Sequence, residues 1–231
     1  GILVWPEELQ WGNYAKALVG SNFLHYLGNS IVINVLAVIL VVLISVMAAF
    51  ACGRMHWKLS GLVSMLLMMG LMIPIHATLL PNYMIFDRVG ILDSLFALLI
   101  PYVAFSLPQG FFLTSSYMDS VPKELEEAAM IDGCGTVRMF FSVVLPMLKP
   151  ILATVAVLNV LWIWNDYLLP YLILGKPITI PLSQMYFYGQ YNQQWHLIMA
   201  GFVVSTVPVV IFFLFMQKYI INGIAAGAVK G

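Results

Sequence analysis

Ionisable residues that could do chemistry are few in this sequence. Only 9% of the 231 residues are charged, and 62% are hydrophobic. Asp166 is the one carboxylate that stands well inside an apolar run. Because an ionised group is expensive to bury in a membrane, such a residue is a functional hypothesis by default. Asp166 could serve as a gate or pair with another subunit, or it could be an interfacial anchor together with Asn165.

Motifs of enzyme active sites are absent from the sequence. It contains no GxxxxGK[ST] to cradle phosphates, no HExxH and no GxSxG. We therefore predict that the chain is not an enzyme and binds no cofactor of its own. Cys52 and Cys134 lie far apart, which predicts neither a disulfide framework nor a metal site. A formal net charge of zero gives no general case for nucleic-acid binding.

The longest polar connection, residues 119–150, holds the pattern with the most chemical meaning. Pro122 suits a first helical turn, and the glutamates that follow would interact favourably with the helix dipole. Three apolar residues at helical spacing predict one small apolar face: Leu125, Ala128 and Ala129. Gly133 and Gly135 are expected to end this helix in a sharp turn.

A second short helix is predicted at residues 136–144. Its apolar residues are Val137, Phe140, Phe141 and Val144. Two short amphipathic helices at an angle would form a knob that another protein can grip. The alternative is a pair of interfacial helices that lie on the lipid.

The knob must be positioned by the long apolar runs that precede and follow it in the sequence. A bilayer core about 30 Å thick needs about 20 mostly apolar helical residues. Five such runs predict an all-α membrane protein with five spans: 28–53, 59–86, 94–118, 151–174 and 196–216. Prolines inside the runs, among them Pro74 and Pro108, predict kinks or unwound turns.

Basic residues indicate the orientation of the spans. With five spans the connections alternate sides, and most of the 10 lysines and arginines fall on the side of the polar connection. These are Arg54, Lys58, Lys123, Arg138, Lys149, Lys218 and Lys230. The other side has Lys16, Arg88 and Lys176. The positive-inside rule then predicts a cytoplasmic polar connection and a cytoplasmic C-terminus.

The polar connection resembles the EAA loop of ABC importer permeases, whose signature is EAA-x3-G-x9-I-x-LP. Here Glu127-Ala128-Ala129, Gly133 and Leu145-Pro146 match it at the right spacing, and Val143 replaces the isoleucine. In that family the loop forms coupling helices that dock in a cleft of the cytoplasmic ATPase. The resemblance thus implies an ATPase contact at these six matched residues. It also implies that ATP and magnesium are used by the partner ATPase.

The resemblance covers essentially the whole chain and is to the smaller permease of maltose-type sugar importers. The ending, residues 217–231, is similar to that subgroup's tail, which reaches between the two ATPase subunits. It implies an ATPase contact through Asn222, Gly223, Gly227 and Lys230. Taken from its chemistry alone, this Gly/Ala-rich end would be a flexible tail beside anionic lipid.

The loop 174–195 is rich in tyrosine, glutamine and asparagine. Aromatic and amide groups suit sugars, and relatives dip this loop into the solute-binding protein. Tyr188 and Gln190 are therefore candidate contacts, and an aromatic belt at the membrane interface is the alternative.

The resemblance implies the type I ABC importer fold, with six spans expected in the parent protein. The expected divisions are an exterior segment 1–27, a permease domain 28–222 with its coupling loop 119–150, and a cytoplasmic tail 223–231. The implied function is that of a permease subunit in an ATP-driven importer of a sugar or related carbohydrate, in a bacterial or archaeal cytoplasmic membrane. The implied partners are two ATPase subunits, a different sister permease and an exterior solute-binding protein.

Two other function classes were weighed against this one. An ion-driven secondary transporter predicts paired intramembrane carboxylates and internal repeats, and the sequence has one such carboxylate and no clear repeat. A purely structural membrane scaffold gives no reason for the EAA spacing.

Overall fold

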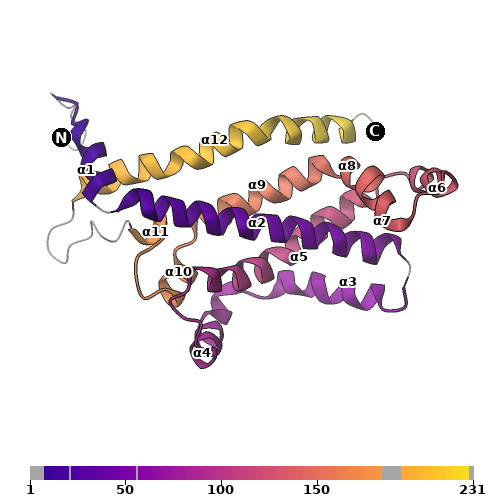
Figure 1. Ribbon diagram of the computed structural model, residues 1–231, viewed down its shortest axis with the longest axis horizontal. Coiled ribbons are helices and arrows are strands. Elements are labelled where there is room, and N and C mark those ends of the chain that lie inside the picture. Colours follow the sequence, from indigo (N-terminus) through magenta and orange to yellow (C-terminus); the bar gives the residue numbers. More distant parts are fainter. Residues whose placement is uncertain (1–7, 21, 56, 184–193, 229–231) are drawn as a thin grey trace.

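A computed structural model describes residues 8–20, 22–55, 57–183 and 194–228, with side chains described as far as residue 218. Within these residues every regular element is a helix. The long helices run roughly along one axis of the molecule (Figure 1). The predicted all-α fold is confirmed.

In the part of the chain that the structure describes, three helices are long and apolar enough to cross a membrane by themselves. They are α2 (Phe23–Arg54), the helix formed by η3 (Leu95–Leu98) with α5 (Leu99–Met118), and α12 (Trp195–Ala228). At 1.5 Å per residue, the 32 residues of α2 extend about 48 Å. Helix α2 ends at a basic residue, Arg54, which suits the negative end of the helix dipole.

The predicted span 59–86 is broken at Pro74. Helix α3 (Ser60–Met69) is followed by the 3-10 turns η1 (Gly70–Met72) and η2 (Ile75–Thr78), and then by α4 (Leu79–Val89). The two halves meet at 95°. Ile73 and Pro74 are both extended, as expected where proline disfavours helical geometry in the residue before it. The expected effect of this proline is confirmed.

The predicted run 151–174 also forms two helices. Helix α9 (Lys149–Asn165) ends where Asp166 becomes extended, and the short α10 (Leu168–Ile173) follows. At its other end α9 is bent by 72° from the segment 136–147. Counting each bent pair as one span gives up to five spans among the described residues. The number agrees with the prediction, although the pair that contains α9 covers 136–165 and not 151–174.

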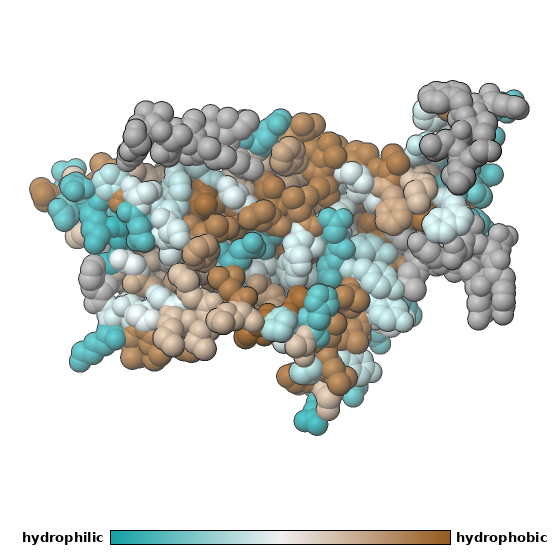
Figure 2. All heavy atoms as spheres, turned by 180° about the vertical axis from the view of Figure 1, so that it is seen from behind, coloured by the Kyte–Doolittle hydropathy of each residue, from teal (hydrophilic) through white to brown (hydrophobic). Residues whose placement is uncertain are grey.

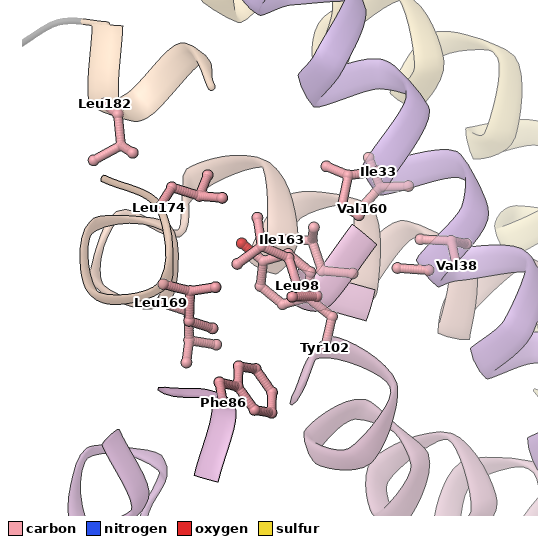
Figure 3. Packing of buried hydrophobic residues seen from close by; sticks show 13 residues of the cluster. Ile33, Val38, Phe86, Leu98, Tyr102, Val160, Ile163, Leu169, Leu174 and Leu182 are labelled. Atoms are coloured by element: carbon pink, nitrogen blue, oxygen red, sulfur yellow. The ribbon is translucent and has the colours of Figure 1, made fainter. Parts of the chain in front are cut away.

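Helices α2, α5 and α9 pack against one another along most of the molecule. Small residues bring them close: a Cβ added at Gly110 of α5 would collide with Ser45 of α2 and touch Val155 of α9. The first buried cluster lies among these helices and reaches α4, α10 and α11 (Ile180–Ser183) (Figure 3). Its labelled members are Ile33, Val38, Phe86, Leu98, Tyr102, Val160, Ile163, Leu169, Leu174 and Leu182.

A second buried cluster lies at the far end of α2 and α5. It joins these helices to α6 (Glu124–Ile131) and α7 (Thr136–Met139), and to the segment 140–148. The third cluster fastens α1 (Gly12–Gly20) to the start of α12 through Ala17, Leu197, Ile198 and Ala200. The N-terminal segment, predicted to approach the membrane from outside, is thus helical over 12–20 and packs on the bundle.

The surface fits a membrane protein. Large apolar side chains are exposed along α2, α3 and α12. Figure 2 shows apolar side chains over much of the middle of one face and hydrophilic ones at the end that carries α6 and α7. Figure 1 places the end of α2, helix α6 and the C-terminal end of α12 at one end of the molecule, and α1 and α11 toward the other. For the basic residues that the structure describes, which leave out Lys230, the predicted division follows these two ends.

Candidate functional site

The predicted knob exists and begins with α6. Glu124, Glu126 and Glu127 all lie in its first turn, where the backbone N–H groups of a helix favour negative charge. The N–H groups of Glu126 and Glu127 both donate to the carbonyl of Lys123, at 2.9 and 3.0 Å. The helix begins at Glu124 with Lys123 as its N-cap, so Pro122 precedes the first turn and does not lie in it as predicted, whereas the glutamates do.

Helix α6 ends in a Schellman motif. The N–H of Cys134 donates to the carbonyl of Ala129 at 2.9 Å, and the N–H of Gly133 donates to that of Met130 at 3.0 Å. Gly133 has φ of +79°, where any other L-residue is strained by about 1–2 kcal/mol. A Cβ at this glycine would meet open space, so the backbone conformation is what requires glycine. The EAA-x3-G spacing therefore places an alanine at the third-last helical position and a glycine just past the end.

The two sides of α6 have different surroundings. Glu126 and Ala129 face inward and are buried, whereas Leu125, Glu127 and Ala128 are exposed. The single apolar face predicted for Leu125, Ala128 and Ala129 is thus divided between interior and surface. A partner that approaches the knob would meet Glu127 and Ala128, and Ala129 holds the helix on its own chain.

Glu126 is paired with Arg54, the last residue of α2. The guanidinium Nε lies 3.2 Å from Oε1 of Glu126, and both side chains are almost fully buried. The Nη2 group also donates to the carbonyls of Met118 at 2.6 Å and Val121 at 2.7 Å. Arg54 was predicted near this end, but its pairing with Glu126 was not, because 72 positions separate the two residues in the sequence.

The second half of the knob runs from α7 through the π-helical turn η4 (Phe140–Val144) to α8 (Leu145–Met147). Phe140 and Val144 are buried, while Val137 and Phe141 are exposed. Phe50 of α2 packs on Phe140 with ring centroids 5.0 Å apart. This half is therefore fixed to the bundle on one side and open on the other.

Leu145 and Pro146 lie next to the bend into α9. Proline has no N–H and clashes with the carbonyl four residues before it, so it favours a departure from regular α-helix such as η4. Leu148 is fully buried at the bend. The LP pair of the signature thus marks the point where the knob continues into a transmembrane helix.

The open side of the knob is apolar. Ile131 is 87% exposed and Val137 72% exposed, and α6 packs against α7. The other large exposed side chains on this surface are Leu125, Met130 and Phe141. Such a patch, next to the carboxylate of Glu127, suits a protein partner.

The carboxylate of Asp166 accepts hydrogen bonds from two other residues of the chain. The hydroxyl of Tyr102 in α5 donates to its Oδ2 at 3.0 Å, and the N–H of Leu168 donates to its Oδ1 at 3.2 Å. Trp162 meets the Tyr102 ring edge to face, with centroids 5.6 Å apart. These contacts join the end of α9 to α5, and the predicted role of Asp166 in a gate remains a prediction.

A pocket of about 280 Å³ opens at the break after α3. Its polar side chains are Ser106 and Gln109 of α5 and Asn159 of α9, with the rings of Phe105 and Trp162 beside them. Asn159 Nδ2 donates to the carbonyl of Val155 at 2.8 Å, which leaves its amide oxygen for another donor. The sequence analysis missed this pocket, although amides inside uncharged spans were a visible signal.

Several predicted site residues lie outside the described residues, or in a segment of which only the backbone is described. Tyr188, Gln190 and Lys230 lie outside the described residues. Asn222, Gly223 and Gly227 belong to α12, whose backbone is helical to Ala228, so the predicted boundary between 222 and 223 falls inside a helix. No cluster of potential metal ligands occurs in the described part of the chain.

Known proteins with similar sequences agree with the membrane-protein fold described above. Residues 41–225 match the family described as binding-protein-dependent transport system inner membrane component. A starch degradation products transport system permease protein of Thermoanaerobacterium thermosulfurigenes is 36% identical over 227 residues, covering 97% of this chain and 82% of the relative. A multiple sugar-binding transport system permease protein of Streptococcus mutans is 36% identical over 235 residues, covering 99% and 84%.

Among solved structures, a bacterial ABC transporter involved in the import of the acidic polysaccharide alginate has a similar chain. The TM-score is 0.79 at 24% identity, and the match covers 94% of this chain and 81% of the other. At that identity the likeness shows a shared fold.

Proposed function

This chain belongs to the family of binding-protein-dependent transport system inner membrane components, and from that premise we propose that it is a carbohydrate permease subunit driven through its α6–α7 knob by a partner ATPase. The chain is a multi-pass membrane protein with the fold of an ABC importer's transmembrane subunit. The proposal concerns the solute, the partners and the residues that meet them.

The observation that carries the proposal is the geometry of the knob. Helix α6 ends in a turn that requires Gly133, and its outer side presents Glu127, Ala128 and an apolar patch around Ile131. The inner side is fixed to α2, and the following segment continues through Leu145 and Pro146 into α9. A force on this surface would therefore reach transmembrane helices through packed side chains.

The proposed assembly has two ATPase subunits, a different sister permease and an exterior solute-binding protein. ATP and magnesium are used by the ATPase and not by this chain. The knob and the C-terminal end of α12 lie at the same end of the molecule (Figure 1). The basic residues of that end, such as Arg138 and Lys149, support a cytoplasmic location by the positive-inside rule.

A carbohydrate solute is supported by the relatives and by the pocket at the break after α3. The printed names of the two relatives refer to starch degradation products and to multiple sugars. The pocket combines amide groups of Gln109 and Asn159 with the ring of Trp162. Amides exchange hydrogen bonds with hydroxyls, and a ring face packs on the C–H face of a sugar. We propose this pocket as part of the solute path.

The test is extraction of the chain in a mild detergent, tagged at an internal exterior loop, with identification of the proteins that accompany it. We expect an ATPase that is lost from the Gly133→Asp variant, which places a charged side chain in the left-handed turn. Gly135→Asp is the matched control. Its φ of −70° accepts any residue, and aspartate there would cap the start of α7.

Recovery of a stable chain without an ATPase would contradict the proposal and favour an ion-driven transporter. Equal loss of the ATPase from both aspartate variants would mean that charge, and not the turn, determines the contact. In that case the proposed role of Gly133 would be wrong although the importer assignment would stand.

A further inference from the structure

The buried ion pair between Arg54 and Glu126 joins elements that the chain connects only over a long distance. Arg54 ends α2, and Glu126 is in the first turn of α6. Their side chains are exposed by only 6% and 7%. Breaking a buried pair leaves an uncompensated charge in the interior, so each partner strongly depends on the other.

The same guanidinium also holds the end of α5. Met118 is the last residue of α5, and its carbonyl, one of the groups at a helix end without a partner inside the helix, accepts from the N–H of Val121 at 3.0 Å. Arg54 donates to this carbonyl and to that of Val121 in the link to α6. Arginine suits this position because its planar fork serves several acceptors at once, whereas lysine offers a compact point charge.

Apolar side chains surround the pair and fix its geometry. Met118 and Val121 are buried beside it, and Ala129 of α6 belongs to the same cluster as Phe50 of α2. Without the pair, the chain would connect α6 to its neighbours through the link 119–123 on one side and the glycines at 133 and 135 on the other. Its remaining support would be its packing on α7 and η4 and the burial of Ala129 in the cluster that contains Phe50.

Two neighbouring glutamates therefore have different surroundings. Successive residues of an α-helix are rotated by about 100°, so Glu127 faces outward while Glu126 faces Arg54. We propose that Arg54 and Glu126 are positioning residues that hold α6 and the ends of α2 and α5 as one rigid unit. A displacement of α6 by the partner ATPase then moves α2 and α5 together with α9. This inference rests on the proposed function.

The test measures distances between spin labels in the complex purified with its ATPase, with Cys52 and Cys134 replaced by alanine. One pair joins Glu124 on α6 to Met47 on α2, both exposed. A second pair joins Glu124 to Trp11 at the opposite end, also exposed. Both pairs are measured without nucleotide and after trapping with MgATP and vanadate.

In the otherwise unchanged complex, we expect the 124–47 distance to stay the same on trapping while the 124–11 distance shifts. In Arg54→Met, the single 124–47 distance should be lost and a broad or second population should appear. Arg54→Lys should be intermediate because it keeps the charge but not the fork. Lys123→Met, an exposed charge beside the same helix, is the control and should leave both distances unchanged.

A purely structural role is separated by the double variant Arg54→Met with Glu126→Met. Replacing a buried ion pair by apolar residues is often neutral for stability, so this variant should regain the melting temperature lost in Arg54→Met. The carbonyls of Met118 and Val121 still lack the guanidinium that ties them to α2, so the 124–47 distance should still broaden on trapping.

A 124–47 distance that changes on trapping in the unchanged complex would overturn the inference, as would an Arg54→Met complex that keeps one fixed distance in both states. If instead neither label pair responds to MgATP and vanadate in a complex that contains the ATPase, the proposed function itself fails.

Discussion

The turn at Gly133 gives a prediction whose magnitude follows from the structure. Its two hydrogen bonds, from Gly133 and Cys134, stabilise the turn by about 1 kcal/mol each. Alanine at φ of +79° costs about 1–2 kcal/mol. Gly133→Ala should therefore lower the closed-to-open equilibrium constant of the turn about 5- to 30-fold, which brings the turn close to balance at the larger cost and reduces ATPase retention by up to about twofold.

A series of side chains makes the conformational argument sharper. Asparagine enters the left-handed region more readily than alanine, and a β-branched residue is a true outlier there. Retention of the ATPase in a detergent-wash assay should therefore fall in the order Gly, Asn, Ala, Val at position 133. Quantitative immunoblotting of the ATPase against the tagged chain gives the measurement.

The matching series at Gly135 is the control, because this residue has φ of −70° and ψ of 159° and open space around a Cβ. All four residues at position 135 should retain the ATPase about equally. Wild-type retention by Gly133→Val would refute the reasoning. So would a Gly135→Val variant that loses as much ATPase as Gly133→Val, since the backbone would then not be the cause.

Three further predictions concern packing, partner contact and solute. Gly110→Ala should destabilise the chain by about 1–3 kcal/mol because its Cβ meets Ser45. A lowered melting temperature in detergent would show this. Gly28→Ala, whose Cβ faces open space, is the control. Ile131→Ser should weaken ATPase retention about tenfold, by roughly 1.5 kcal/mol of lost apolar contact, without a change in melting temperature, because this side chain is 87% exposed. Gln109→Leu should raise the maltodextrin concentration for half-maximal uptake about tenfold through the loss of a hydrogen bond. ATPase retention should stay unchanged. An unchanged half-maximal concentration would exclude this pocket from the path of that solute.

Much of the architecture could be predicted from local pattern. Uncharged runs predicted α2, α5 and α12, because few other arrangements satisfy a backbone inside a membrane. The break at Pro74 and the turn at Gly133 were predictable because proline and glycine act on their own backbone. The glutamates lie in the first turn of α6 as predicted, whereas Pro122 lies just before it, because the helix begins one residue after the N-cap Lys123.

Features that depend on distant residues were not predictable in the same way. The end of α9 at Asn165 follows from Asp166, which binds the N–H of Leu168 and the hydroxyl of Tyr102. The apolar run continues past this point, so hydropathy alone predicted one span over 151–174. The pocket at the break after α3 likewise requires the broken segment 70–75 to meet α5 and α9, which no single segment specifies.

In helix α6, the residue that begins the signature is not the one that fixes the orientation of the helix. The EAA signature begins at Glu127, and the resemblance directed attention to that residue. The inward side of the helix is instead selected by Arg54, a cation on another helix that also binds two backbone carbonyls. An outward Glu126 would leave this buried guanidinium without its carboxylate, so a rotation of α6 by one residue is strongly disfavoured. The outward position of Glu127, the residue proposed to meet the partner, is thus determined by Glu126 and Arg54 on the inner side.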